Sequence, residues 1–358
     1  MIFDFATGIR VSAPTTVLAT MTAAVQRDVL IKGGRAIEQL AQLDALVFDK
    51  TGTLTTGVAR VTEVVPLAGL SADELLSLAA AAEQRLSHPA AQAIVRAAER
   101  RGLPLLERGE SHVAIGLGVE AHVEGRVVLV GSERFLANRE IMLPGDVRRE
   151  AAQAGRAGSS SVFVALDGQL VGAVRYADVP RPEAGAVLAG LRARGIRRFV
   201  MVTGDNEAVA RAVAREVGID EVEAGVFPER KAEVVRALQA AGHTVGVIGD
   251  GINDSPALAY ADVSFSLKEG TDVARETADV VLHGDLHGLT EAIDLGRESM
   301  RLLRQNLAIV ALPNAAGMLL ATTGALGPLA ATALNNGSAV AAAFNGLRPL
   351  MADRAAAR

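Results

Sequence analysis

Cysteine and tryptophan are absent from this sequence of 358 residues, and aromatic residues make up only 3% of it. Without cysteine the chain can form no disulfide, no thiolate nucleophile and no thiolate metal site. The net charge of −5 argues against a basic surface for nucleic acid, so we expect no nucleic-acid partner. No basic leader precedes an apolar run at the N-terminus, as a cleavable signal peptide would require. Half of the residues are hydrophobic, and the length predicts two or three structural units.

An apolar run, Ala45–Phe48, leads directly into Asp49-Lys50-Thr51-Gly52-Thr53-Leu54-Thr55. A short apolar run that ends in turn residues predicts a buried parallel strand that stops at Asp49. Ligands of open α/β sheets bind at the carboxyl ends of strands, so we expect Asp49 beside a crevice. A carboxylate with hydroxyls and glycine amides beside it suits a nucleophile that attacks a phosphoryl group. The alternative is an ordinary strand followed by a capped helix.

Polar residues also follow two later apolar runs and open one helix. Phe199–Val202 leads into Thr203-Gly204-Asp205-Asn206, and Val245–Ile248 leads into Gly249-Asp250-Gly251-Ile252-Asn253-Asp254. Pro228 favours the first position of a helix that contains Lys231. The candidate roles are Thr203 for a phosphoryl oxygen, Lys231 for positive charge, Asp250 and Asp254 for Mg²⁺, and Asn253 in support. Each segment alone is typical of a turn or a helix cap, but their order after apolar strands indicates an active site.

Residues 58–168 predict a mixed α/β insert between two runs of βα alternation. We expect a strand over 58–67, helices over 71–82 and 88–101, a strand meander over 113–130, and a hairpin around Asp167-Gly168. Ser71, followed three residues later by Glu74, is typical of a capping box. The insert makes the domain that contains Asp49 discontinuous.

The longest uncharged stretch lies near the C-terminus. Leu307–Leu347 contains no Asp, Glu, Lys, Arg or His, and its length suffices for two spans of about 20 residues. Gly324–Pro328 predicts the turn between them, and arginines flank both ends. A helical hairpin places these arginines on one side, as the positive-inside rule favours for a cytoplasmic face. The alternative is a buried hairpin in a soluble protein. Val11–Val25, near the N-terminus, predicts only a partial span.

Four segments together resemble the motifs of P-type ATPases, the ion pumps of the haloacid-dehalogenase superfamily. They are Asp49–Thr55, Thr203–Asn206, Lys231, and Gly249-Asp250-Gly251-Ile252-Asn253-Asp254-Ser255-Pro256. The resemblance covers essentially the whole chain. It implies an α/β, haloacid-dehalogenase-like Rossmannoid phosphorylation domain, an inserted mixed α/β nucleotide-binding domain and a C-terminal transmembrane helical hairpin. It also implies ATP and Mg²⁺ as cofactors, with Asp49 as phosphoryl acceptor and with Asp49 and Thr51 at the Mg²⁺ site.

Two features of the insert resemble the heavy-metal-transporting subgroup. His88-Pro89, with Glu83 upstream, is similar to its histidine–proline nucleotide motif, although Leu86-Ser87 replaces the usual Ser-Glu. Gly116-Leu117-Gly118-Val119 is similar to its glycine pair. The resemblance therefore assigns nucleotide binding to Glu83, His88, Gly116, Gly118 and Asp205.

Thr51 separates two reaction classes. Phosphatases of this superfamily usually carry an Asp two residues after the nucleophile, where this chain has Thr51. A threonine hydroxyl cannot act as a general acid or base near neutral pH. We therefore expect an aspartyl-phosphate on Asp49 to persist, which suits a pump more than a hydrolase.

The chain departs from the family at the transported-ion site. Phe5-Ala6-Thr7 stands where family pumps place Cys-Pro-Cys, so the usual soft-metal site is excluded. Amide and hydroxyl oxygens suit harder ions, and the candidate ligands are Thr7, Asn306, Asn314, Asn335, Asn336 and Ser338. The alternative is that these side chains only join neighbouring helices.

The expected organisation is a partial transmembrane helix (1–26), a phosphorylation domain (27–57 and 169–296), a nucleotide-binding domain (58–168), two transmembrane helices (297–348) and a tail (349–358). Only a partial span precedes Asp49, so we expect the C-terminal portion of a pump without the actuator domain and first transmembrane helices. A truncated frame, a fragment, or a split protein whose separate chain supplies those parts all remain open.

The expected function is the catalytic portion of an ATP-driven cation transporter, with a divalent or heavy metal as cargo. The alternatives are a membrane-tethered phosphohydrolase and a non-transporting fragment that binds nucleotide. We expect a multi-pass protein of the plasma or inner membrane that contacts lipid and has cytoplasmic catalytic domains. The sequence names neither the ion nor its direction.

Overall fold

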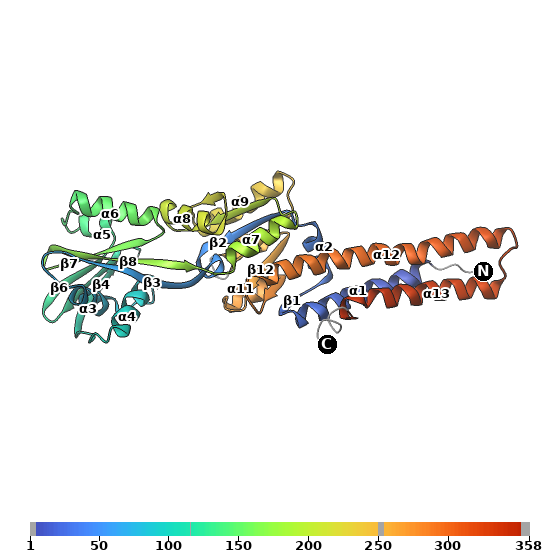
Figure 1. The fold of residues 1–358 in the computed structure, drawn as a ribbon, viewed down its shortest axis with the longest axis horizontal. Helices are drawn as coiled ribbons and strands as arrows, with labels where there is room; N and C mark the ends of the chain where they lie inside the picture. Colours follow the sequence, from blue (N-terminus) through green and yellow to red (C-terminus); the bar gives the residue numbers. More distant parts are fainter. Residues whose placement is uncertain (1–4, 115, 250–253, 352–358) are drawn as a thin grey trace. The chain divides into compact units, whose positions relative to one another are not determined.

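The computed structural model describes residues 5–114, 116–249 and 254–351, in which the chain forms two compact units. Unit 1 comprises Met1–Phe48, Gly185–Phe199 and Pro228–Arg358, and unit 2 comprises Asp49–Ala184 and Val200–Phe227. Figure 1 draws the elements in chain order from blue to red.

The helices of the described residues range from five to 35 residues in length. They are α1 Phe5–Gln26, α2 Gly34–Gln42, α3 Ala72–Glu83, α4 Pro89–Arg100, α5 Glu133–Ala137, α6 Gly145–Arg156, α7 Ala184–Ala193, α8 Glu207–Val217, α9 Pro228–Ala240, α10 Ser255–Tyr260, α11 Asp272–Thr277, α12 Gly288–Thr322 and α13 Pro328–Gly346.

The strands belong to two sheets. They are β1 Val29–Ile31, β2 Ala45–Asp49, β3 Thr55–Pro66, β4 Arg108–Ala114, β5 Gly118–Val123, β6 Arg126–Gly131, β7 Ser160–Leu166, β8 Gln169–Pro180, β9 Arg198–Val202, β10 Glu221–Glu223, β11 Val245–Ile248, β12 Val263–Leu267 and β13 Val280–Leu282.

The sheet of unit 1 has the strand order β1-β13-β12-β11-β2, with the start of β9 next to β2. Its strands pair in parallel except at β1, which is antiparallel to β13. All of β11 and the first four residues of β2 are buried, as continuous apolar runs predict for strands covered on both faces. Phe48 lies opposite Ile248, so β2 and β11 end at the same edge of the sheet. The sequence predicted β2 and β11 correctly but not the antiparallel edge strand.

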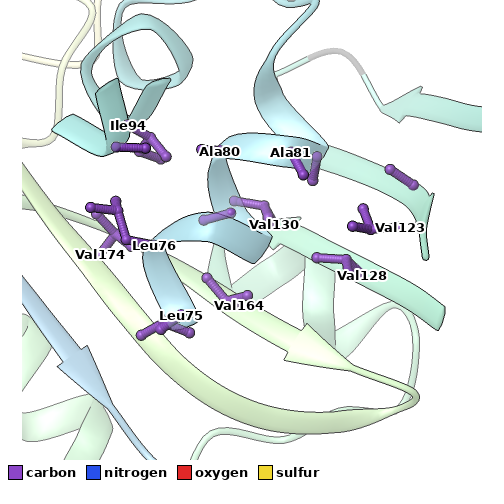
Figure 2. Close-up of a cluster of buried hydrophobic side chains, with 14 of the residues drawn as sticks. Leu75, Leu76, Ala80, Ala81, Ile94, Val123, Val128, Val130, Val164 and Val174 are labelled. Atoms are coloured by element: carbon purple, nitrogen blue, oxygen red, sulfur yellow. The ribbon is translucent and has the colours of Figure 1, made fainter. Parts of the chain in front are cut away.

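Unit 2 is built around an antiparallel sheet with the order β3-β8-β7-β6-β5-β4. The β7–β8 hairpin turns at Asp167 and Gly168, both with positive φ, as expected. Helices α3 and α4 cover one face, and Figure 2 shows Leu76 and Ile94 among the valines of the strands. The end of β9 pairs in parallel with β10 within this unit.

Local signals explain where α3 begins. Ser71 accepts a hydrogen bond from the backbone N–H of Glu74, and the Glu74 carboxylate accepts one from the backbone N–H of Ser71. This is the reciprocal capping box that the sequence predicted. The meander is also confirmed, because β4, β5 and β6 cover most of residues 108–131.

Three helices of unit 1, α1, α12 and α13, pack against one another. The expected turn is confirmed, because α12 ends at Thr322 and α13 begins at Pro328. Helix α12 starts at Gly288, well before the predicted span, because buried Leu289 and Ile293 extend its apolar face between charged residues. Among the described helices, α12 alone is long and apolar enough to cross a membrane, judged by length and composition.

The base of α12 is held against the sheet layer of unit 1. Arg194, just after α7, donates hydrogen bonds from Nε and Nη2 to the Asp294 carboxylate at 2.7–2.9 Å. A Cβ placed on Gly296 would lie 2.7 Å from the Cβ of Leu40 in α2, so only glycine permits this close helix contact. Pro313 lies further along the helix.

Candidate functional site

The segment after Asp49 is a tight, irregular turn rather than a helix start. Thr51 has an extended backbone, and Gly52 has a φ of 76°. Arg181 fixes the turn, because its guanidinium donates to the carbonyls of Gly52 at 3.1 Å and Thr53 at 3.0 Å. The strand end predicted for Asp49 is confirmed, and this turn joins it to β3.

Lys50 forms an ionic cluster that sequence reasoning missed. Its side chain is buried and contacts the carboxylates of Asp205 and, at 3.9 Å, Asp178. The Thr55 hydroxyl lies within hydrogen-bonding distance of Asp178 as well. Burial raises the pKa of Asp178, although the Thr55 hydrogen bond and the Lys50 charge oppose that rise. The residue that follows the candidate nucleophile therefore carries a positive charge shared by two carboxylates.

Thr203 is buried at the end of β9. Its backbone N–H donates to the Glu223 carbonyl at 2.9 Å, and its carbonyl accepts from the N–H of Val226 at 3.1 Å. Its hydroxyl oxygen accepts from the N–H of Asp205 at 3.2 Å. The structure thus places Thr203 and Asp205 in one turn of unit 2, with Asp205 paired to Lys50.

Lys231 and Asp254 form a buried ion pair in unit 1. Lys231 Nζ lies 2.6 Å from Asp254 Oδ1, and their side chains are 10% and 4% exposed. A Cβ on Gly249 would lie 2.7 Å from the Cβ of Asp254, so the chain needs glycine there. Asp250 and Asn253 lie outside the described residues. Within the described part of the chain, no group of three or more His, Asp or Glu side chains could hold a metal ion.

A cavity of about 290 Å³ in unit 2 brings four predicted nucleotide residues together. Its lining includes Glu83, His88, Gly116, Gly118, Gly131, Ser132, Ser161 and Tyr176. Sequence reasoning missed Ser132, Ser161 and Tyr176, which come from strands and turns with no motif of their own.

Each predicted residue of this cavity has a defined structural reason for its place. Burial of Glu83 raises the pKa of its carboxyl to about 7, while the charge of Arg108 opposes the rise. His88 precedes α4, and its Nδ1 accepts from the N–H of Ala90 at 3.2 Å. A Cβ on Gly118 would lie 2.5 Å from the Val130 carbonyl oxygen, and Gly116 has a φ of 73°.

The polar side chains of α1, α12 and α13 fall into separate groups. Asn306 donates to Thr16 Oγ1 at 3.1 Å and accepts from Asn345 at 2.8 Å. Asn314 donates to Ser338 Oγ at 3.0 Å, and the Ser338 hydroxyl donates to the Asn335 carbonyl at 2.8 Å. Thr7 and Asn336 are exposed. The six candidate ion ligands therefore do not form one cluster.

The fold and the Asp49 segment identify the family. Residues 43–262 match the haloacid dehalogenase-like hydrolase family. This chain belongs to the haloacid dehalogenase-like hydrolases. Unit 2 of this haloacid dehalogenase-like chain contributes the insert with the Glu83 cavity, and unit 1 contributes most of the parallel sheet.

The relatives of this haloacid dehalogenase-like chain are P-type ATPases. It is 42% identical to the "Zinc-exporting P-type ATPase" of Mycobacterium marinum over 340 residues, covering 94% of this chain and 46% of the relative. It is 43% identical to the "Manganese-exporting P-type ATPase" of Mycobacterium tuberculosis, with 94% and 47% covered. The chain thus spans about half the length of the curated relatives it matches. The predicted resemblance to heavy-metal P-type ATPases is confirmed.

Solved structures agree with the fold. A zinc-transporting PIB-type ATPase in the E2.Pi state matches with a TM-score of 0.82 and 36% identity, covering 96% of this chain and 56% of that one. The catalytic domain of the CPx-ATPase CopB-B, from a structure that concerns conformational changes upon nucleotide binding, matches with a TM-score of 0.62 and 28% identity. That match covers 76% of this chain and 98% of the CopB-B domain. The predicted α/β fold class is confirmed, while the residue roles and domain boundaries stay predictions.

Proposed function

We propose that this chain is the catalytic portion of an ATP-driven cation transporter in which Asp49 accepts the γ-phosphoryl group of ATP. One observation supports this most strongly. Unit 2 contains both a cavity with Glu83 and His88 and, on the same sheet-bearing unit, the Asp49 turn with the Lys50–Asp205 ion pair. Phosphoryl transfer requires the nucleotide and the acceptor to be brought together, and one compact unit that carries both the cavity and Asp49 supports this.

In the proposed step, a carboxylate oxygen of Asp49 attacks the γ-phosphorus. The new bond joins that oxygen to phosphorus, the bond between the γ-phosphorus and the β–γ bridging oxygen breaks, and ADP leaves with the electron pair. The Thr203 hydroxyl donates a hydrogen bond to a phosphoryl oxygen, since its own oxygen already accepts one from the N–H of Asp205. Lys231 supplies positive charge. Thr51 offers no acid or base for rapid hydrolysis, so the acyl-phosphate persists.

The donor set after β2 and β11 fits Mg²⁺ chemistry. Carboxylate and carbonyl oxygens are the ligands that Mg²⁺ prefers, and the proposed ligands are Asp49, Thr51, Asp250 and Asp254, with Asn253 in support. When bound, Mg²⁺ neutralises phosphate charge. Lys231 Nζ contacts Asp254 Oδ1 at 2.6 Å, so a metal ion at Asp254 would share that carboxylate with the lysine.

The nucleotide is proposed to bind in the Glu83 cavity. Gly116 leaves open space for a planar base, Gly118 is needed for close packing against Val130, and Glu83 and His88 offer polar edges. Because the carboxyl of Glu83 has a pKa near 7, it can donate or accept a hydrogen bond at physiological pH. Asp205 is proposed to act at the phosphate end through its pairing with Lys50.

The transported cation is proposed to contact the Asn314 group. In the part of the chain that the structure describes, the buried Oδ1 of Asn314 has no hydrogen-bond partner, and Ser338 lies beside its amide. A buried carbonyl oxygen without a donor is costly, and a cation would satisfy it. Asn306 instead has partners on both amide atoms, which supports the helix-joining alternative there. Thr7, Asn335 and Asn336 remain outer candidates, and the ion itself is unassigned.

We further propose that α12 and α13 cross the plasma or inner membrane in contact with lipid, with both units' catalytic residues cytoplasmic. The apolar length of α12 supports this placement. The rest of a complete pump, the actuator domain included, is proposed to come either from further sequence or from a separate chain.

Labelling with γ-phosphate-labelled ATP and Mg²⁺ tests the proposal. We expect an acid-stable, hydroxylamine-sensitive adduct in the wild type and none in Asp49→Asn. Asp146→Asn, an exposed carboxylate of α6, serves as the matched control and should label like the wild type. Turnover of small phosphate esters without an adduct would support a tethered phosphohydrolase. Nucleotide binding without adduct or turnover would support a fragment that only binds nucleotide.

A further inference from the structure

Strand β8 runs along both parts of the proposed reaction site in unit 2. Val174, Tyr176 and Asp178 occupy alternate positions on it, and alternate side chains of a strand share a face. The pairing of Val174–Tyr176 with β7 is regular, and Tyr176–Asp178 pairs regularly with β3. Arg175, between them in sequence, contacts Glu150 of α6 on the other face.

Along this face of β8 the surroundings change from the hydrophobic core to the cavity and then to the Lys50 cluster. Val174 lies in the hydrophobic core beside Leu76 and Ile94, as Figure 2 shows. Tyr176 lines the cavity that contains Glu83 and His88. Asp178 contacts Lys50, the residue after Asp49. Successive positions on one strand face are about 7 Å apart, so Tyr176, in the cavity wall, lies one step from the hydrophobic core and one step from Asp178.

The pKa of Tyr176 is affected by carboxylates from both the Lys50 cluster and the Glu83 cavity. Burial raises the pKa of its phenol most, hydrogen bonding with Ser160 opposes that rise, and the carboxylates of Asp205 and Glu83 each raise it further. Asp205 belongs to the Lys50 cluster, and Glu83 belongs to the cavity. The phenol is therefore neutral at physiological pH, so its hydroxyl keeps a proton with which it can donate a hydrogen bond.

We propose that the Tyr176 hydroxyl donates a hydrogen bond to a ribose hydroxyl of the bound adenine nucleotide. The ribose joins the base to the phosphates, so a donor between the Glu83 cavity and the Lys50 cluster faces the sugar. This inference rests on the proposed nucleotide cavity. It makes Tyr176 a substrate contact that distinguishes ribonucleotides from deoxyribonucleotides.

The test compares ADP, 2′-deoxy-ADP and 3′-deoxy-ADP by calorimetric titration of the full chain, because ADP cannot transfer a γ-phosphoryl group. A hydrogen bond to the ribose corresponds to about a three- to tenfold affinity difference. In the wild type we expect one deoxy nucleotide to bind weaker by that factor. In Tyr176→Phe, ADP should fall to the same level while that deoxy nucleotide is unchanged. Tyr260→Phe, the chain's other tyrosine, is the control and should bind all three as the wild type does.

Two results would overturn the assignment of Tyr176. The wild type could bind all three nucleotides equally, a readout that needs no variant to fold. Alternatively, Tyr176→Phe could keep the full wild-type preference for ADP. Loss of the proposed cavity function is a different result: ADP binding would then be undetectable, or would be unaffected by His88→Ala. If His88→Ala weakens ADP and Tyr176→Phe does not, the cavity stands and the ribose contact fails.

Discussion

Lys50 and Lys231 are both buried lysines beside carboxylates, yet they hold their charge in different ways. Lys231 in unit 1 pairs with Asp254, whose side chain is only 4% exposed. We call this pair closed because both side chains are shielded from water. Lys50 in unit 2 divides its charge between buried Asp178 and Asp205, which is 40% exposed. The Asp205 side chain is partly exposed although the oxygen that contacts Lys50 is buried, so Asp205 can turn to water at lower cost than Asp254 can. We therefore expect the closed pair to fix structure and the open one to be the more easily rearranged.

The closed pair should be the harder to break. In Lys231→Met, Asp254 loses its lysine in a buried position, and we expect the free energy of unfolding to fall by about 3–5 kcal/mol at pH 7. Urea denaturation followed by circular dichroism measures it. Lys268→Met, an exposed lysine of the same unit, should change stability by less than about 0.5 kcal/mol. A loss below about 1 kcal/mol in Lys231→Met would contradict the closed-pair description.

Glu83 extends the comparison to a buried acid without a lysine. Its folded-state pKa of about 7 lies above the ordinary 4.5, so the folded protein binds its proton more tightly than the unfolded chain does. That stability is fully present below pH 4.5 and is lost as the pH rises to about 7. In Glu83→Gln this loss disappears, so the variant should gain about 2–3 kcal/mol relative to the wild type between pH 4.5 and 8.

Measuring the free energy of unfolding at pH 4.5 and pH 8 tests whether Glu83→Gln gains stability relative to the wild type as the pH rises. Glu99→Gln, an exposed glutamate of the neighbouring α4, is the control and should keep the wild-type pH dependence. A Glu83→Gln variant that loses stability relative to the wild type as the pH rises would show that the carboxyl is ionised and well paired in the fold.

The open cluster should cost less to disrupt. In Lys50→Met, Asp205 can turn to water, and Asp178 keeps its contact with Thr55, so we expect a loss of only about 1–2 kcal/mol at pH 7. Removing the lysine charge raises the pKa of Asp178 further, so the loss should shrink toward pH 5 as the carboxyl takes up a proton. Denaturation at pH 5 and 8 measures both. A loss as large as that of Lys231→Met would remove the distinction between the two lysines.

Breaking an exposed charge pair should cause the smallest loss of stability among these variants. Arg101 contacts Asp73 at 2.8 Å with both side chains largely exposed. Arg101→Gln should therefore change the free energy of unfolding by less than about 1 kcal/mol, and the change should vanish at high salt. Denaturation at low and at 1 M salt gives the comparison. A large loss of unfolding free energy that does not depend on salt would contradict the idea that solvent exposure determines how much each charge pair contributes to stability.

The two lysines also show how far sequence reasoning reached. Apolar runs before turn residues located β2 and β11, and the capping box located α3, because these signals are local. Lys231 was found by its place in a helix that opens with proline. Lys50 was overlooked although it follows Asp49 directly, because its partners lie 128 and 155 positions later in sequence and only tertiary folding brings them together.

The same limit applies to α1, α12 and α13 and to the cavity. Asn306 and Asn314 are the same residue type on one helix, but only packing decides that the first has partners on both amide atoms and the second does not. Tyr176 belongs to no motif, and its position follows from strand alternation across a sheet whose register the sequence did not specify. The base of α12 was missed because charged residues interrupt its apolar face.

The contacts at Asp294 and Gly296 fix the base of α12, so the helix can tilt about this base as a lever does about a fulcrum. Gly296 packs closely against α2, and the Arg194–Asp294 hydrogen bonds hold the helix two residues earlier. From Gly296 to Thr322 the rod extends for about 39 Å, at 1.5 Å per residue. A tilt of about 5° at the fulcrum would move its far end by about 3 Å, roughly half the rise of one helical turn. A small tilt at the base would thus grow along the helix, reaching Asn314 part-way and about 3 Å at Thr322.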